Sequence, residues 1–132
     1  MTDLTASNGS PETELHSAAW AGDVDFAIEL LQKGIDVNIQ DSIGESPLHG
    51  AAAWGRIDMV KFLLNHSANP NLKNQDNATP LHLACSHGNE RTVELLISNG
   101  AKLIPNGQGK TPLEIAKHHN KQHIIAWLKR NT

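Results

Sequence analysis

The fold of this protein is decided by residues 46–55, which read SPLHGAAAWG. A similar stretch returns 33 residues later (46 to 79) as TPLHLACSHG, at residues 79–88. Weaker copies read ELHSAAWAG at residues 14–22 and TPLEIAK at residues 111–117. A period near 33 residues is typical of stacked structural repeats. The sequence therefore predicts a repeat solenoid, in which each unit packs mainly on its neighbours.

Each copy predicts a pair of helices. A Ser or Thr that can cap a helix precedes a Pro that suits the first helical position, as in Ser46-Pro47 and Thr79-Pro80. After a turn at Gly55 or its equivalent, a second stretch carries apolar residues at spacings of three and four, which favours an amphipathic helix. Clusters of Asn, Asp and Gly between the copies predict tight, hairpin-like turns.

These residues resemble the ankyrin-repeat family, whose motif Thr-Pro-Leu-His-x-Ala is met in full at residues 79–84. The resemblance covers about residues 13–130. It implies an all-α solenoid of helix-turn-helix units joined by projecting β-hairpin-like loops. The outer units depart from the motif, as expected of caps that have one neighbour each. The expected repeats lie at about residues 11–40, 41–73, 74–105 and 106–132.

Composition argues against several classes of function. The net charge of −3 and the pI near 6.2 give no basic field for nucleic acid. A single cysteine, Cys85, excludes an intrachain disulfide and favours a reducing compartment. No apolar run approaches the ~20 residues that cross a bilayer. Residues 1–10 show no signal-peptide pattern and are expected to form a flexible leader. We expect a cytoplasmic monomer that binds neither nucleic acid nor membrane.

Charge is unevenly distributed along the chain. Residues 1–45 carry nine acidic side chains and one basic side chain, Lys33, whereas residues 46–132 carry five acidic and ten basic ones. Ordinary solubilising surface accounts for this difference. The alternative is that the acidic end orients a charged partner.

Three of the eight histidines, His16, His49 and His82, recur once per repeat. The resemblance implies that this histidine binds loop backbone and ties one repeat to the next. Rings one repeat apart are roughly 10 Å from each other, the spacing of packed helices. Zinc ligands lie ~2 Å from one ion, so these three residues cannot share a metal.

The other histidines of interest are His87, His118, His119 and His123. His87 and His119 occupy equivalent positions in adjacent repeats, so they can face the same groove. A metal-binding site and a pH-sensing surface are both open here, and titration near neutral pH favours the second. We expect no functional metal and no cofactor.

The sequence contains no motif that indicates a catalytic site. Cys85 would be the only thiol nucleophile, but its equivalents are Ala19 and Ala52, which indicates a small buried position. Residues 107–111, GQGKT, resemble a phosphate loop superficially, yet their place in the repeat predicts a turn before a helix. We expect no catalytic residue.

Residues that vary between copies mark the expected partner surface. The resemblance implies a concave face formed by hairpin tips and the ends of the first helices. Trp20 and Trp54 stand out there because their equivalents are small or polar, so they predict either partner contacts or local groove filling. The predicted partner-binding residues are Trp20, Ile43, Glu45, Trp54, Lys73, Asp76, His87, Lys110, His118 and His119.

The sequence thus predicts a non-enzymatic protein–protein interaction module that binds an unknown protein partner in its concave groove. Adaptor, inhibitor and immunity-type neutraliser all fit this description. The alternative is a metal-binding or pH-sensing regulatory site at the histidine-rich end.

Overall fold

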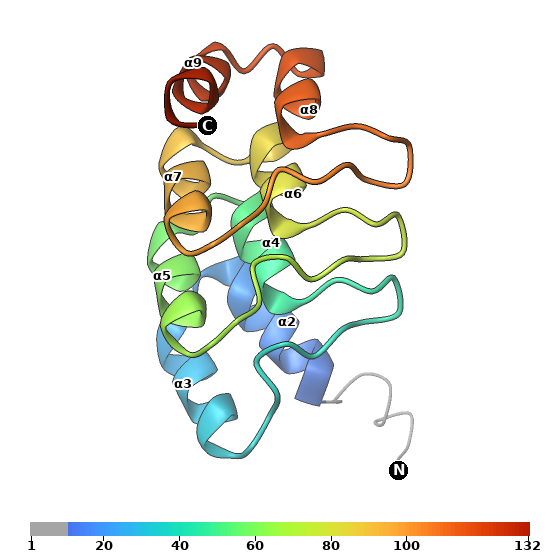
Figure 1. Cartoon of the computed structure of the whole chain (residues 1–132). Coiled ribbons are helices and arrows are strands. Elements are labelled where there is room, and N and C mark those ends of the chain that lie inside the picture. The colour runs from blue at the N-terminus through green and yellow to red at the C-terminus, as the bar shows by residue number, and fades with distance from the viewer. Residues whose placement is uncertain (1–10) are drawn as a thin grey trace.

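The computed structural model describes residues 11–132, so the predicted leader at residues 1–10 lies outside the described part of the chain (Figure 1). The described residues form eight helices and no strand. The helices are α2 (Pro11–Ala21), α3 (Val24–Gln32), α4 (Pro47–Ala53), α5 (Ile57–Asn65), α6 (Pro80–His87), α7 (Glu90–Ser98), α8 (Pro112–His118) and α9 (Gln122–Asn131).

The helices form four consecutive pairs that stack in one direction (Figure 1). The first helices, α2, α4, α6 and α8, form one column, and each contacts the first helix of the next pair. The second helices, α3, α5, α7 and α9, form an outer column beside it. Three loops project away from the first helices on the side opposite the outer column. The predicted all-α solenoid is confirmed.

Capping side chains define where the first helices begin. Ser46 caps α4, and the Nδ1 atom of His49 accepts a hydrogen bond of 3.0 Å from the Ser46 backbone N–H. Thr79 and His82 form the same reciprocal arrangement at α6, also at 3.0 Å. At α8 the place of the histidine is taken by Glu114, whose Oε1 accepts from the Thr111 backbone N–H. These contacts satisfy backbone groups that a helix start leaves unpaired.

The same histidines join each repeat to the loop of the next. The Nε2 atoms of His16, His49 and His82 lie 2.7, 2.9 and 3.0 Å from the carbonyl oxygens of Glu45, Ala78 and Lys110, respectively.

For His49 and His82 this geometry fixes a neutral ring, because Nδ1 accepts from a backbone N–H while Nε2–H donates to a carbonyl. Burial lowers the pKa of both rings from its ordinary range, which is consistent with a neutral ring.

Small side chains fill the core between the first helices. Ala19, Ala52, Ala84 and Cys85 are fully buried in the column of first helices. Burial raises the pKa of the Cys85 thiol to about 12, so the thiol stays protonated and unreactive near neutral pH.

The projecting loops are hairpin-like turns without assigned strands. Each turn is closed by a backbone hydrogen bond, from Asp41 N to Glu45 O at 2.9 Å in the first loop and from Asn74 N to Ala78 O at 3.0 Å in the second. Neighbouring loops are joined as well, because Gln75 N donates to Ile43 O at 3.0 Å. The loops therefore form a connected edge of the solenoid.

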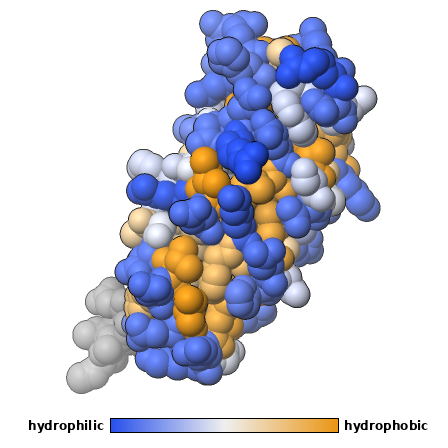
Figure 2. Space-filling model, turned by 90° about the vertical axis from the view of Figure 1, so that its left-hand side faces the viewer, coloured by the Kyte–Doolittle hydropathy of each residue, from blue (hydrophilic) through white to orange (hydrophobic). Residues whose placement is uncertain are grey.

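The outer column presents a mixed surface. Figure 2 shows apolar side chains running along this face in a band that hydrophilic side chains interrupt. Many apolar residues of these helices, such as Phe62, Leu95 and Trp127, are half-buried against the core. Among the residues that the structure describes, no helix has the length and apolar character needed to span a membrane.

A candidate partner-binding groove

Two adjoining cavities lie between the first helices and the projecting loops. The first has a volume of about 440 Å³ and is lined by Glu45, Ala53, Trp54, Leu83 and His87. The second has a volume of about 530 Å³ and is lined by Glu45, Asn74, Gln75, Asp76, Ala78, Leu83, Asn106, Gly107 and Gln108. Glu45 and Leu83 line both cavities, so together they form one surface, which we call the inner groove.

Trp54 forms one end of the inner groove. It follows the last residue of α4, and its side chain is 67% exposed. Ala53 precedes it, and Leu83 from α6 is half-buried in the same cavity. A large aromatic ring with this exposure, beside an apolar floor, has the character of a binding hot spot.

Trp20 has a different environment, although its side chain is also 40% exposed. Its ring lies on Gly50 of the next repeat so closely that a Cβ atom at Gly50 would be 2.0 Å from both Cδ1 and Nε1 of the indole. Its carbonyl oxygen accepts a 2.8 Å hydrogen bond from Nε of Arg56. Repeat packing therefore explains why a large residue stands here, which corresponds to the local groove filling that the sequence left open as the alternative to partner contact.

Glu45 forms the other end of the first cavity. Its backbone is fixed, because its N–H donates to Oδ1 of Asp41 at 2.9 Å and its carbonyl oxygen pairs with His16. Its carboxylate accepts a 3.2 Å hydrogen bond from Asn74 Nδ2. No Lys or Arg among the described residues forms an ion pair with it.

The surroundings of Glu45 act on its acidity in opposite directions. Burial raises its pKa, the hydrogen bond from Asn74 and the charge of His16 lower it, and the neighbouring carboxylates of Asp41 and Asp76 raise it, with a net upward shift. Glu45 is thus a half-buried acid whose negative charge is incompletely compensated by the chain itself.

Histidines gather beside the first cavity of the inner groove, next to His87. The ring centres of His87 and His119 are 5.8 Å apart, and those of His118 and His119 are 5.1 Å apart. Oγ of Ser86 lies 2.6 Å from Nδ1 of His87. Desolvation, followed by the charges of His118 and His87, lowers the pKa of His119. Within residues 11–132, no group of three or more His, Cys, Asp or Glu side chains is arranged to hold a metal ion.

The remaining predicted site residues lie on the loops but do not line the two cavities. Ile43 is 52% exposed at the first loop tip. Lys73 and Lys110 are exposed, and their carbonyl oxygens accept hydrogen bonds from Gln40 and His82. The structure therefore brings Glu45, Trp54 and His87 to one cavity and Glu45 and Asp76 to the other, and the ring of His119 contacts those of both His87 and His118.

Eight of the twelve residues that line the inner groove are not among the predicted partner-binding residues, and Leu83 is the most informative of them. Leu83 stands at the variable position of the Leu-His-x-Ala motif, where the preceding repeat has Gly50. This difference between copies was the available signal, because a position that varies from Gly to Leu changes the shape of the surface that the repeats share.

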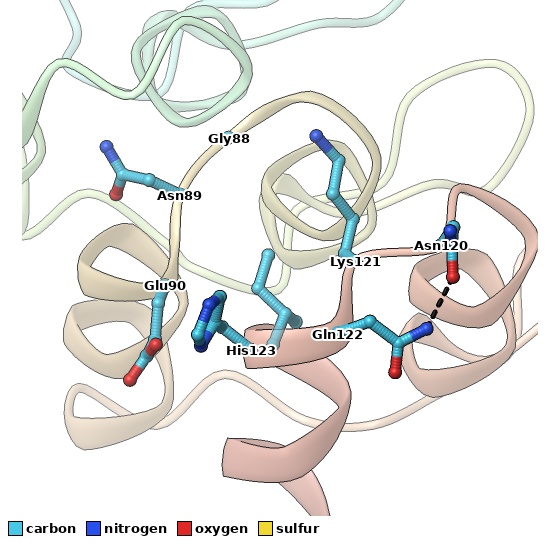
Figure 3. Close-up of a pocket in the computed structure, with 8 residues that line it drawn as sticks. Gly88, Asn89, Glu90, Asn120, Lys121, Gln122 and His123 are labelled. Atoms are coloured by element: carbon cyan, nitrogen blue, oxygen red, sulfur yellow. Dashed lines mark hydrogen bonds between the residues drawn. The ribbon is translucent and has the colours of Figure 1, made fainter.

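A further cavity lies near the turns between paired helices. Its volume is about 420 Å³, and Gly88, Asn89, Glu90, Asn120, Lys121, Gln122, His123 and Ile124 line it. In Figure 3 the side chains of Glu90 and His123 lie next to each other in this cavity, while the side chain of Lys121 points away from both of them. A similar cavity of about 440 Å³ lies at the turns of the first two repeats, around Gly22 and Gly55. Because it recurs, we attribute this feature to repeat stacking rather than to a specific site.

Comparison with known families agrees with the geometry. The family model described as "Ankyrin repeats (many copies)" matches residues 15–64 and again residues 48–97, which together are more than half of the chain. The chain belongs to the ankyrin-repeat family. Ankyrin repeats are general protein–protein interaction modules, and the family is typically non-enzymatic. No curated protein is similar enough to this chain to match it.

Proposed function

We propose that this ankyrin-repeat protein is a non-enzymatic adaptor, inhibitor or neutraliser that holds a protein partner in its inner groove. The observation that carries the proposal is Trp54, whose highly exposed ring stands over a cavity with an apolar floor. The scaffold beneath it is held by capping and bridging histidines, so the surface is preformed. Preformed surfaces bind tightly because little conformational entropy is lost on association.

The partner enters along the first helices and loops in this proposal. Trp54 and Leu83 supply apolar contact, while the loop residues Asn74, Asp76 and Asn106 supply polar contacts at the rim. This arrangement of an apolar centre and a polar rim is typical of protein interfaces. We further propose that the protein acts as a cytoplasmic monomer without nucleic-acid or membrane binding, in line with its composition.

A pull-down with three forms of the protein tests the proposal. Wild type, Trp54→Ala and Ile28→Ala are immobilised and exposed to a native lysate of the source organism. Ile28 is a matched control, because it is a 38% exposed apolar residue on α3 in the outer column. We expect partners that bind wild type and Ile28→Ala but bind Trp54→Ala about 30-fold more weakly, a loss of about 2 kcal/mol. Partners that bind all three forms equally would contradict groove binding.

The histidine cluster supports a second candidate function, a pH-sensing end of the groove. His87, His118 and His119 are close enough for their protonated forms to repel one another. Since the pKa of His119 is lowered, its ring is mainly neutral at pH 7 and gains positive charge as the pH falls below the ordinary histidine range. Partner affinity measured between pH 7.5 and pH 5.5, in wild type and in His119→Gln, tests this candidate. An identical pH profile for both would contradict it.

A further inference from the structure

The side chains that line the first cavity of the inner groove restrict the kind of partner side chain that can bind there. One end is a half-buried carboxylate, Glu45, and the other is the exposed ring of Trp54. Between them the lining is apolar, from Ala53 and Leu83. The backbones of Glu45 and Trp54 are nine residue steps apart along Ser46 and α4, roughly 13 Å at 1.5 Å per helical residue, and their side chains reach toward each other from the two ends. A group that fits must be long, apolar along its length and complementary to a carboxylate at its tip.

The charge at the Glu45 end points to a cation. Its carboxylate has Asn74 as its hydrogen-bond partner and no Lys or Arg of the described chain in an ion pair with it, while the charge of the nearby His16 favours its ionised form. The carboxylates of Asp41 and Asp76 lie near enough to add to the negative potential. A half-buried carboxylate gains most from a partner that brings both opposite charge and hydrogen-bond donors.

We propose that this cavity binds an arginine side chain of the protein partner, with the guanidinium at Glu45 and the aliphatic stem along Leu83, Ala53 and Trp54. Lysine and arginine both combine a long apolar stem with a cation. Arginine is favoured because its planar guanidinium carries several donors and can satisfy a carboxylate with two parallel hydrogen bonds. This assignment rests on the proposed function, since it names the partner chemistry that the same groove recognises.

His87 adds a second element to the site. It lines the cavity beside Trp54, near the point where the backbone of the arginine-bearing segment would enter. A neutral imidazole there can exchange a hydrogen bond with that backbone, whereas an imidazolium would repel the arriving guanidinium. The groups that face His87 are Ser86, whose hydroxyl contacts its Nδ1, and His119, which follows the last residue of α8, with Glu45 lining the same cavity.

A defined peptide library tests the assignment without knowledge of the natural partner. Random 12-residue peptides displayed on phage are selected on the wild-type protein at pH 7.5, and peptides that also bind Trp54→Ala are removed. We expect the remaining peptides to share an arginine at a fixed position. If no Trp54-dependent peptide is recovered, or if the recovered peptides lack a shared cationic residue, the assignment is overturned.

A synthetic copy of one selected peptide then locates the cation. Its arginine is replaced by citrulline, which keeps the length and shape but removes the charge. We expect citrulline to weaken binding to the wild type about 10-fold or more, and to weaken binding to Glu45→Gln less than twofold, because the charge pair is then already lost. Glu29→Gln is the matched control, since Glu29 is an exposed acid on α3 and its removal changes the net charge equally.

The outcomes separate this assignment from the proposed function. A citrulline penalty that is the same in wild type and Glu45→Gln would overturn the arginine site, while Trp54-dependent partners in the pull-down would still support groove binding. Folding of each variant is checked by circular dichroism, and a Glu45→Asp variant provides a second measurement. Because it keeps the charge on a shorter side chain, it should retain a citrulline penalty between those of wild type and Glu45→Gln.

Discussion

The junction between the first two repeats and the junction between the second and third use tryptophan differently. At the first junction, Trp20 covers Gly50 and fills the space that the missing side chain leaves. At the second junction the corresponding pair is Ala53 and Leu83, so the large residue has moved to the facing helix. Trp54, one position further along the chain, covers no such gap and remains 67% exposed.

This difference shows that exposure alone does not identify a binding residue in a repeat protein. Trp20 and Trp54 are both exposed large aromatic residues at the ends of first helices. The partner across the junction distinguishes them: a glycine makes the ring part of the packing, whereas a leucine beside an open cavity leaves the ring available. The role of each tryptophan depends on a residue about one repeat away.

The largest effect on stability is expected when a new side chain at Gly50 competes with the Trp20 ring for the same space. Leucine at Gly50 would place a side chain where the indole now lies, so Gly50→Leu should lower the free energy of unfolding by about 2 kcal/mol. In a Trp20→Ala background the same substitution should have the opposite sign. The space is then free, and leucine is a better helix former than glycine by about 0.8–1 kcal/mol.

Urea unfolding of wild type, both single variants and the double variant measures this coupling. The double variant reproduces the Ala53–Leu83 arrangement of the next junction, which gives the experiment an internal reference. Equal destabilisation by Gly50→Leu in both backgrounds would show that Trp20 and Gly50 do not form a packing pair.

A smaller effect is expected when each tryptophan is shortened alone. Trp20→Ala should lower the free energy of unfolding by about 1–2 kcal/mol, because it opens a gap over Gly50. Trp54→Ala should change it by less than about 0.5 kcal/mol, as expected of an exposed side chain without such packing. Urea titrations followed by circular dichroism compare the two, and similar losses would remove the distinction between scaffold and binding residue.

Much of the fold was predictable from the sequence because the repeats of one chain can be aligned with each other, which identifies the positions that recur. The positions that recur, such as Leu48, His49 and Ala51, are buried, and the Ser-Pro and Thr-Pro pairs begin helices as predicted. A capping side chain and its helix are close in sequence, so local patterns are sufficient to locate them.

The inner groove was harder to predict because it depends on contacts between repeats. The sequence identified Glu45, Trp54 and His87 as candidates, and the structure brings them to one cavity. It did not identify Leu83 as the floor, nor Gly50 as the support of Trp20. Both omissions have the same cause: comparison of equivalent positions shows which residues vary, but the shape of a surface depends on which non-equivalent positions face each other across a junction.

The smallest expected effect separates the histidines that hold the junctions from those that line the groove. Burial lowers the pKa of His49 and His82 below the ordinary value of about 6.5, so the unfolded chain binds more protons than the folded chain just below that pH. Their contribution is therefore complete above about pH 6.5, and stability falls as the pH decreases from 6.5 toward the folded-state values.

Glu45 acts in the opposite direction, because its raised pKa makes the folded state the stronger proton binder above about pH 4.5. The Glu45→Gln variant removes that titration, so its thermal midpoint should fall more clearly than that of wild type between pH 7.5 and pH 5.5. Adding His119→Gln should leave most of this fall in place, since His119 is exposed and contacts the preceding repeat through the ring of His87 rather than through a hydrogen bond to a loop carbonyl. A midpoint that is constant over this range in Glu45→Gln would mean that His49 and His82 keep their bridges when protonated. The neutral-ring geometry at the junctions would then be wrong.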